Sequence, residues 1–87
     1  MRYIVDCFDM HHAIYAMWTV KKQVEKWKTP VKIFKKDRII QCGDNIFLLA
    51  VRKIEYMGRH DWKRISVDEM YKWFDEKEIE SERNNSI

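Results

Sequence analysis

The longest apolar run of the chain, residues 46–51, limits its possible folds more than any other feature. Its sequence, Ile-Phe-Leu-Leu-Ala-Val, has no polar position, which is typical of a strand buried on both faces. A Gly-Asp-Asn sequence precedes it, and glycine and asparagine tolerate the positive φ angles of tight turns. The sequence therefore predicts a central hairpin whose two strands lie near 38–42 and 46–54.

A strand and then a helix are predicted for the first 27 residues. Residues 3–8 are apolar and β-favouring, and Asp9 after them is a typical N-cap residue. The helix is predicted at about residues 10–27, because Pro30 cannot continue it. The residues that recur at spacings of three and four, and so form one apolar stripe on this helix, are Ala13, Met17, Val20, Val24 and Trp27.

Three further elements are predicted around the hairpin. Residues 31–35 alternate between apolar and charged side chains, as in a half-buried strand. A second helix is expected at about 67–82, with a short strand possible at 64–66 before it. The chain is thus predicted to be a single small α+β or α/β domain at residues 1–80, with a loose C-terminal tail at residues 81–87.

Two sheet arrangements agree with this order of elements. The strands at 3–8 and 64–66 are each followed by a helix, so they can lie parallel in one sheet. Equally, the hairpins can form an antiparallel sheet with both helices on one face. Both arrangements remain open at this point.

The sequence contains no complete catalytic or metal-binding motif, so we expect no enzyme activity, no cofactor and no metal. Cys7, His11 and His12 do not match a recognised zinc spacing. Cys7 and Cys42 are too few for a disulfide scaffold and are expected to be buried thiols. No apolar run is long enough to span a bilayer and no leader is recognisable, so a soluble cytoplasmic protein without membrane contact is expected.

Charge is distributed unevenly along the chain. Residues 21–38 hold eight basic residues and two acids, a net charge of +6, whereas residues 65–87 have a net charge of −4. The candidate site for a protein partner or nucleic acid consists of the eight basic residues Lys21, Lys22, Lys26, Lys28, Lys32, Lys35, Lys36 and Arg38. Trp27 and Phe34 stand among them, and cationic and aromatic groups together are typical of nucleic-acid binding.

The segment Lys63–Glu69 has two interpretations. Ser66 and Glu69 have the spacing of a capping box, in which the serine side chain and the glutamate side chain each bind the other's backbone N–H. Alternatively, residues 64–67 form a strand that places Asp68 and Glu69 at its carboxyl end, where they could hold Mg²⁺ and polarise water. A strand ending at Ser66, which then caps the next helix, would satisfy both patterns.

Residues 31–75 resemble the Walker B half of the ATPase cores of phage terminases and helicases. The hairpin from Arg38 to Leu49 is similar to the one before Walker B, and Gly58–Trp62 stands where those motors have a Gly-Arg loop. The resemblance implies a shortened relative that keeps the scaffold. The chain departs from the family in having no phosphate loop, and Gly43 and Gly58 are its only glycines.

Three functional hypotheses follow. The first is a small non-enzymatic protein that acts by occupying a protein partner; the resemblance suggests a phage accessory or anti-defence inhibitor. The second is a nucleic-acid-binding module that uses residues 21–38. The third is a degenerate ATPase-like fragment in which Asp68 and Glu69 still contact Mg²⁺.

Overall fold

Five strands, two α-helices and one short 3₁₀ helix make up the fold. The computed structural model describes the backbone of residues 1–85 and the side chains of residues 1–80. In chain order the elements are β1 (Arg2–Asp6), α1 (Met10–Val24), β2 (Val31–Phe34), β3 (Ile39–Cys42), β4 (Asn45–Ala50), η1 (Lys53–Tyr56), β5 (Lys63–Ser66) and α2 (Val67–Asn85). None of the described helices is both long and apolar enough to cross a membrane.

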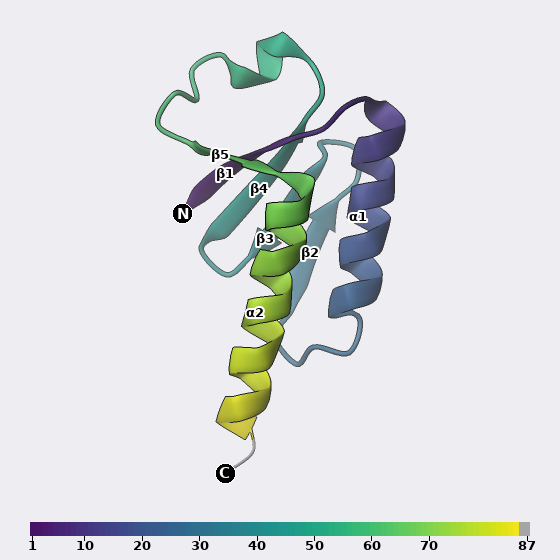
Figure 1. Cartoon of the computed structure of the whole chain (residues 1–87), viewed down its shortest axis with the longest axis vertical. Helices are drawn as coiled ribbons and strands as arrows, with labels where there is room; N and C mark the ends of the chain where they lie inside the picture. Colours follow the sequence, from purple (N-terminus) through teal and green to yellow (C-terminus); the bar gives the residue numbers. More distant parts are fainter. Residues whose placement is uncertain (86–87) are drawn as a thin grey trace.

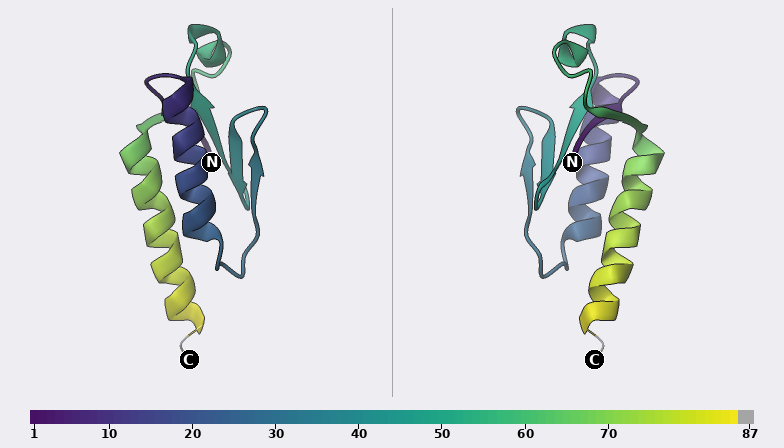
Figure 2. Two further views of the ribbon diagram at one scale, coloured as in Figure 1. Left: turned by 90° about the vertical axis from the view of Figure 1, so that its right-hand side faces the viewer. Right: turned by 90° about the vertical axis from the view of Figure 1, so that its left-hand side faces the viewer.

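The strands form one mixed sheet in the order β2-β3-β4-β1-β5. β1 is parallel to its neighbours β4 and β5, whereas β3 is antiparallel to its neighbours β2 and β4. Both helices cover the same face of the sheet (Figures 1 and 2). The two arrangements suggested by the sequence are therefore combined, since parallel β1 and β5 extend the antiparallel hairpins. The predicted hairpin is confirmed, with Cys42 opposite Asn45 and Gly43 at a φ of +59° in the turn.

The core lies between the sheet and the two helices, and Phe47 of β4 is at its centre. The Phe47 ring stacks on Tyr3 of β1 with centroids 4.8 Å apart, and it meets Trp73 and Phe74 of α2 at 4.9 Å and 5.2 Å. α1 contributes the buried side chains of Ala13, Ala16, Met17 and Val20. The predicted stripe of α1 therefore faces the core. Val24 and Trp27, at its far end, are half-buried against that core.

Three element boundaries differ from the prediction by three residues or more. The strand predicted to reach residue 54 ends at Ala50, because the Glu55 carboxylate accepts hydrogen bonds from the backbone N–H groups of Val51 and Arg52 and turns the chain into η1. α1 ends at Val24, three residues before the predicted end. α2 continues to Asn85, so residues 81–85 are helical instead of forming a loose tail, and 86–87 lie outside the described residues.

The capping box at the start of α2 is confirmed. The Glu69 N–H donates to Ser66 Oγ at 3.1 Å, and the Ser66 N–H donates to Glu69 Oε1 at 3.4 Å. Ser66 is also the last residue of β5, which runs parallel to β1. One serine therefore both ends a strand and caps the helix after it.

Candidate binding groove

The basic residues singled out in the sequence separate into two groups. Seven lysines, Lys21, Lys22, Lys26, Lys28, Lys32, Lys35 and Lys36, are exposed along the end of α1, the following loop, β2 and the turn after it. Arg38 is only 8% exposed and, contrary to the expectation for the eight basic residues, is not part of the exposed surface. The candidate site therefore consists of lysines only.

Arg38 is buried because it links the β2–β3 turn to the segment after β4. Its Nε donates to the Leu49 carbonyl at 3.1 Å, and its guanidinium is paired with Glu55. Burial by itself would raise the pKa of Glu55. The N–H groups of Arg52 and Val51 and the Arg38 guanidinium outweigh it and lower that pKa. Arg38 also has a φ of +56°, which closes the turn between β2 and β3.

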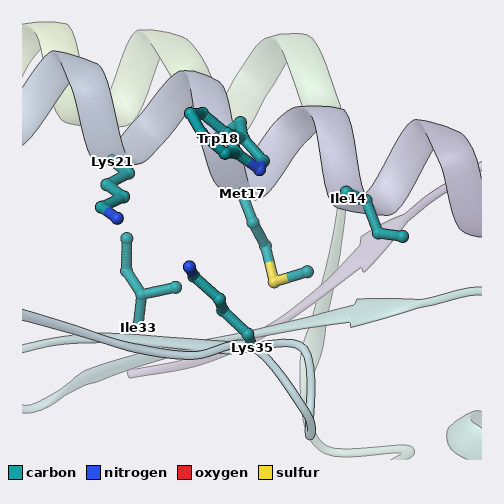
Figure 3. Close-up of a pocket in the computed structure, with 6 residues that line it drawn as sticks. All are labelled: Ile14, Met17, Trp18, Lys21, Ile33 and Lys35. Atoms are coloured by element: carbon teal, nitrogen blue, oxygen red, sulfur yellow. The ribbon is translucent and has the colours of Figure 1, made fainter.

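Two of these lysines, Lys21 and Lys35, line a groove between α1 and β2, the edge strand of the sheet. One hollow of this groove has a cavity volume of about 250 Å³. Its lining residues come from α1, from β2 and from the turn after β2: Ile14, Met17, Trp18, Lys21, Ile33 and Lys35 (Figure 3). A second hollow, of about 460 Å³, shares Lys21, Ile33 and Lys35 with the first and continues toward Pro30. We call these two hollows together the α1–β2 groove.

Trp18 lies on one side of this groove, between two lysines. Its side chain is 52% exposed, and the ammonium nitrogens of Lys21 and Lys35 lie 5.7 Å and 6.0 Å from its ring. A cation over an indole face is attracted by the electron density of the ring. Lys35 belongs to the turn after β2 and Trp18 to α1, so only the tertiary fold brings them together. The groove thus combines aliphatic side chains, one indole and two cations.

One acid, Glu25, lines the second hollow of the groove together with Lys21 and Lys35. Among the side chains described, residues 1–80, none of the seven exposed lysines is in an ion pair. The opposite edge of the sheet differs. The hollow beside β5, of about 240 Å³, is lined by Lys63 and Lys72 together with Glu69 and Glu76, so its charges are balanced. Among the lining residues, Lys21 and Lys35 outnumber Glu25 in the α1–β2 groove, so this edge has a net positive charge, whereas lysines and glutamates are equal in number beside β5.

The sequence indicated Trp27 and missed Trp18, and both line the groove, Trp27 in its second hollow and Trp18 in its first. Trp27 packs on Phe74 with ring centroids 5.8 Å apart and is half-buried, while the exposed ring is that of Trp18. A second stripe of α1 was missed as well: Met10, Ile14 and Trp18 follow one another at intervals of four and are each more than 40% exposed. Their spacing was visible in the sequence. It cannot tell which of two apolar stripes faces the core.

The other candidate residues do not come together as a catalytic or metal site. Cys7 and Cys42 are free thiols, as expected, and burial raises the pKa of Cys7 to about 11, so it is protonated at neutral pH. Asp68 is exposed in the first turn of α2, and the Glu69 carboxylate is engaged in the capping box. Across the described residues, no three His, Cys, Asp or Glu side chains form a group able to hold a metal ion.

Comparisons with known protein families, with curated proteins and with solved structures find no match to this chain.

Proposed function

We propose that this protein is a small non-enzymatic binding domain that acts by occupying a protein partner, and that it holds an acidic, amphipathic segment of that partner in the α1–β2 groove. The observation on which this proposal rests is the apolar hollow at Ile14, Met17 and Ile33, bordered by Lys21 and Lys35 on either side of Trp18.

The two components of the groove have different roles in this proposal. Burial of one aliphatic side chain of the partner in the hollow contributes roughly 1.5–3 kcal/mol. Each exposed ion pair with a lysine adds only about 0–1 kcal/mol, because water and salt screen it. The apolar contact therefore supplies most of the affinity. The lysines select an acidic partner, speed its approach and make binding weaken with salt.

The role in the cell is proposed from resemblance alone. Residues 31–75 resemble part of the motors of phages, and a small domain without catalytic groups suits an accessory or anti-defence inhibitor. Such an inhibitor needs a surface that binds and occupies its partner, and the α1–β2 groove would be that surface.

Nucleic-acid binding is the second candidate, and one observation favours it. Seven exposed lysines lie near the exposed rings of Trp18 and Phe34, which is the combination that holds single strands by phosphate contacts and base stacking. The groove itself favours a protein segment, because its hollow is lined largely by aliphatic side chains.

The test compares capture of partners by four forms of the tagged protein. They are the wild type, Trp18→Ala, the double variant Lys21→Glu/Lys35→Glu, and a control, Lys63→Glu/Lys72→Glu, that changes the net charge by the same amount at the β5 edge. We expect the control to retain a specific partner from nuclease-treated lysate and the two groove variants to lose it. Circular dichroism checks that all four fold. Equal retention by all four would contradict the proposal.

Two further measurements separate the alternatives. Binding of a random 20-nucleotide DNA or RNA at about 50 mM salt, followed by fluorescence anisotropy, tests the second candidate, whose affinity must fall steeply with salt. A Mg²⁺ titration of Asp68→Asn/Glu69→Gln against the wild type tests the ATPase-like hypothesis, which stays a prediction. Identical titration curves for the two proteins would remove it.

A further inference from the structure

We infer that the partner segment binds as an additional β-strand alongside β2, with alternate side chains entering the α1–β2 groove. This inference rests on the proposed function and specifies the conformation of the segment and the spacing of its residues. It also assigns part of the binding to the backbone of β2, beyond the side chains described above.

The outer edge of β2 is free to pair. In the described part of the chain β2 is the first strand of the sheet and pairs only with β3. The other edge strand, β5, lies beside the charge-balanced hollow under α2. The two edges of one sheet therefore differ in net charge: lysines outnumber acids around the hollows next to β2, whereas the two are equal in number around the hollow next to β5.

The hydrogen-bond pattern shows which groups of β2 point outward. Leu49 N donates to Arg38 O, and the two-residue turn pairs Cys42 with Asn45, so Arg38, Ile40 and Cys42 direct their backbone groups toward β4. The backbone groups of successive residues in a strand point to alternate sides, so the N–H and C=O groups of Ile39 and Gln41 point toward β2. Their partners are Phe34 and Lys32.

The N–H and C=O groups left for a new neighbour are therefore those of Val31 and Ile33. The side chains of these same two residues pack toward the helices and line the α1–β2 groove. A strand paired with this edge would lie about 4.8 Å from β2 and directly beside the groove. Backbone pairing and filling of the hollows are therefore geometrically compatible.

An extended segment also matches the spacing of the two hollows. Residues i and i+2 of a strand lie on the same side and about 6.6 Å apart. The two hollows adjoin at Ile33, so two apolar residues at this spacing would enter them in succession. The intervening acidic residues of such a strand lie on the opposite face, near Lys32, so Lys21 and Lys35 are reached only by an acidic residue that stands on the groove side next to the two apolar ones. Segments that alternate apolar and acidic residues therefore fit this edge best.

The lysines also explain why a second copy of this chain is a poor occupant. Two β2 edges brought together would place Lys32 and Lys35 of each copy against those of the other. Lysines on edge strands commonly prevent pairing between identical sheets in this way. The same charges attract an acidic strand, so one feature excludes self-association and favours the partner.

The test uses four capped ten-residue peptides as probes. The first alternates glutamate and valine. The second has the same composition with its valines at helical spacing. The third and fourth are the first peptide with N-methyl groups on all its glutamates or on all its valines, and each blocks hydrogen bonding along one side of the strand. Binding to the ¹⁵N-labelled full chain is followed through the indole N–H signal of Trp18 and through amide exchange.

We expect the alternating peptide to bind at least tenfold more tightly than the helical one. At saturation the amide protons of Val31 and Ile33 should exchange at least tenfold more slowly, while those of Lys32 and Phe34, already bonded to β3, stay unchanged. Methylation in one of the two registers should weaken binding at least tenfold, and in the other register leave it intact. The variant Lys63→Glu/Lys72→Glu should behave as the wild type.

The outcomes distinguish the inference from the proposed function. Equal binding of the alternating and helical peptides at Trp18, without protection of Val31 and Ile33, would overturn strand addition and leave the groove as a binding site. No response of Trp18 to either peptide would overturn both. Protection at β5 in place of β2 would also contradict the inference, since it would place the partner at the opposite edge.

Discussion

Replacing Glu55 by glutamine tests whether the buried ion pair with Arg38 holds the segment after β4 in place. The side chains of Glu55 and Arg38 are 12% and 10% exposed. Glutamine has nearly the same side-chain shape and can still accept hydrogen bonds from the backbone N–H groups of Val51 and Arg52. Its oxygen is uncharged, however, so each of these two hydrogen bonds becomes weaker by about 1 kcal/mol. Arg38 also loses its counter-charge, and loss of one partner of a buried pair costs up to about 3–5 kcal/mol. Partial exposure reduces that cost, so we expect about 3 kcal/mol in total.

The predicted loss is a large share of the whole stability. A domain of this size unfolds with a free energy of roughly 4–13 kcal/mol, from about 0.05–0.15 kcal/mol per residue. With a denaturant slope near 2 kcal/mol per molar urea, a loss of about 3 kcal/mol moves the unfolding midpoint down by about 1.5 M. Urea titration followed by circular dichroism measures this shift.

The pH dependence gives an independent measurement of the same pair. The pKa of Glu55 is lower in the folded protein than its ordinary value of 4.5. Its contribution to stability is therefore complete above about pH 4.5 and is lost as the pH falls through the folded pKa. The wild type should lose this contribution below about pH 4.5, and Glu55→Gln should lack that part of the acid dependence.

Arg52 provides a matched control. It also contacts Glu55, at 3.6 Å, but its side chain is 67% exposed. Arg52→Gln should therefore change the unfolding free energy by less than about 0.5 kcal/mol. An equally small effect of Glu55→Gln would refute the reasoning, because the pair with Arg38 would then contribute no more than an exposed one.

Three further predictions concern the cap, the core and a cysteine. Ser66→Ala should lower the unfolding free energy by about 1 kcal/mol in urea titration, and Ser66→Thr, which keeps the hydroxyl, should not. Phe74→Ala removes a fully buried ring and should cost about 3–5 kcal/mol in the same assay; a loss under 1 kcal/mol would contradict the packing around Phe47. With a pKa of about 11, Cys7 has on the order of 0.1% thiolate at pH 8. In a Cys42→Ser background it should react with iodoacetamide at least 100-fold more slowly than a free thiol, as followed by mass spectrometry.

Local patterns predicted the elements correctly where the interactions that form them are local. The turn at residues 43–45, the capping box of Ser66 and Glu69, and the stripe that contains Ala13 and Met17 each depend on residues close together in sequence. The boundaries failed where a distant group intervened. β4 ends at Ala50 because the Glu55 carboxylate accepts a hydrogen bond from the Val51 N–H. The β propensity of residues 51–54 gives no indication of this hydrogen bond.

The candidate site was predicted only in part, for a related reason. An excess of lysine is a property of composition, and it marked residues 21–38 correctly as the basic region. Whether each cation is free or paired depends on neighbours far along the chain. Arg38 meets Glu55 across 17 residues and becomes buried, whereas Lys35 meets Trp18 across the α1–β2 groove and stays exposed.

The sequence by itself determined that this chain forms one small domain of strands and two helices, α+β or α/β, with a central hairpin and a basic middle segment, because propensity, turn chemistry and charge act over a few residues. Only the tertiary structure decided the sheet order, with β1 inserted between β4 and β5 and β2 left at the edge. That order depends on pairing between distant strands and on which of two apolar stripes of α1 packs against Phe47. It is also what places Trp18, Lys21 and Lys35 around one groove.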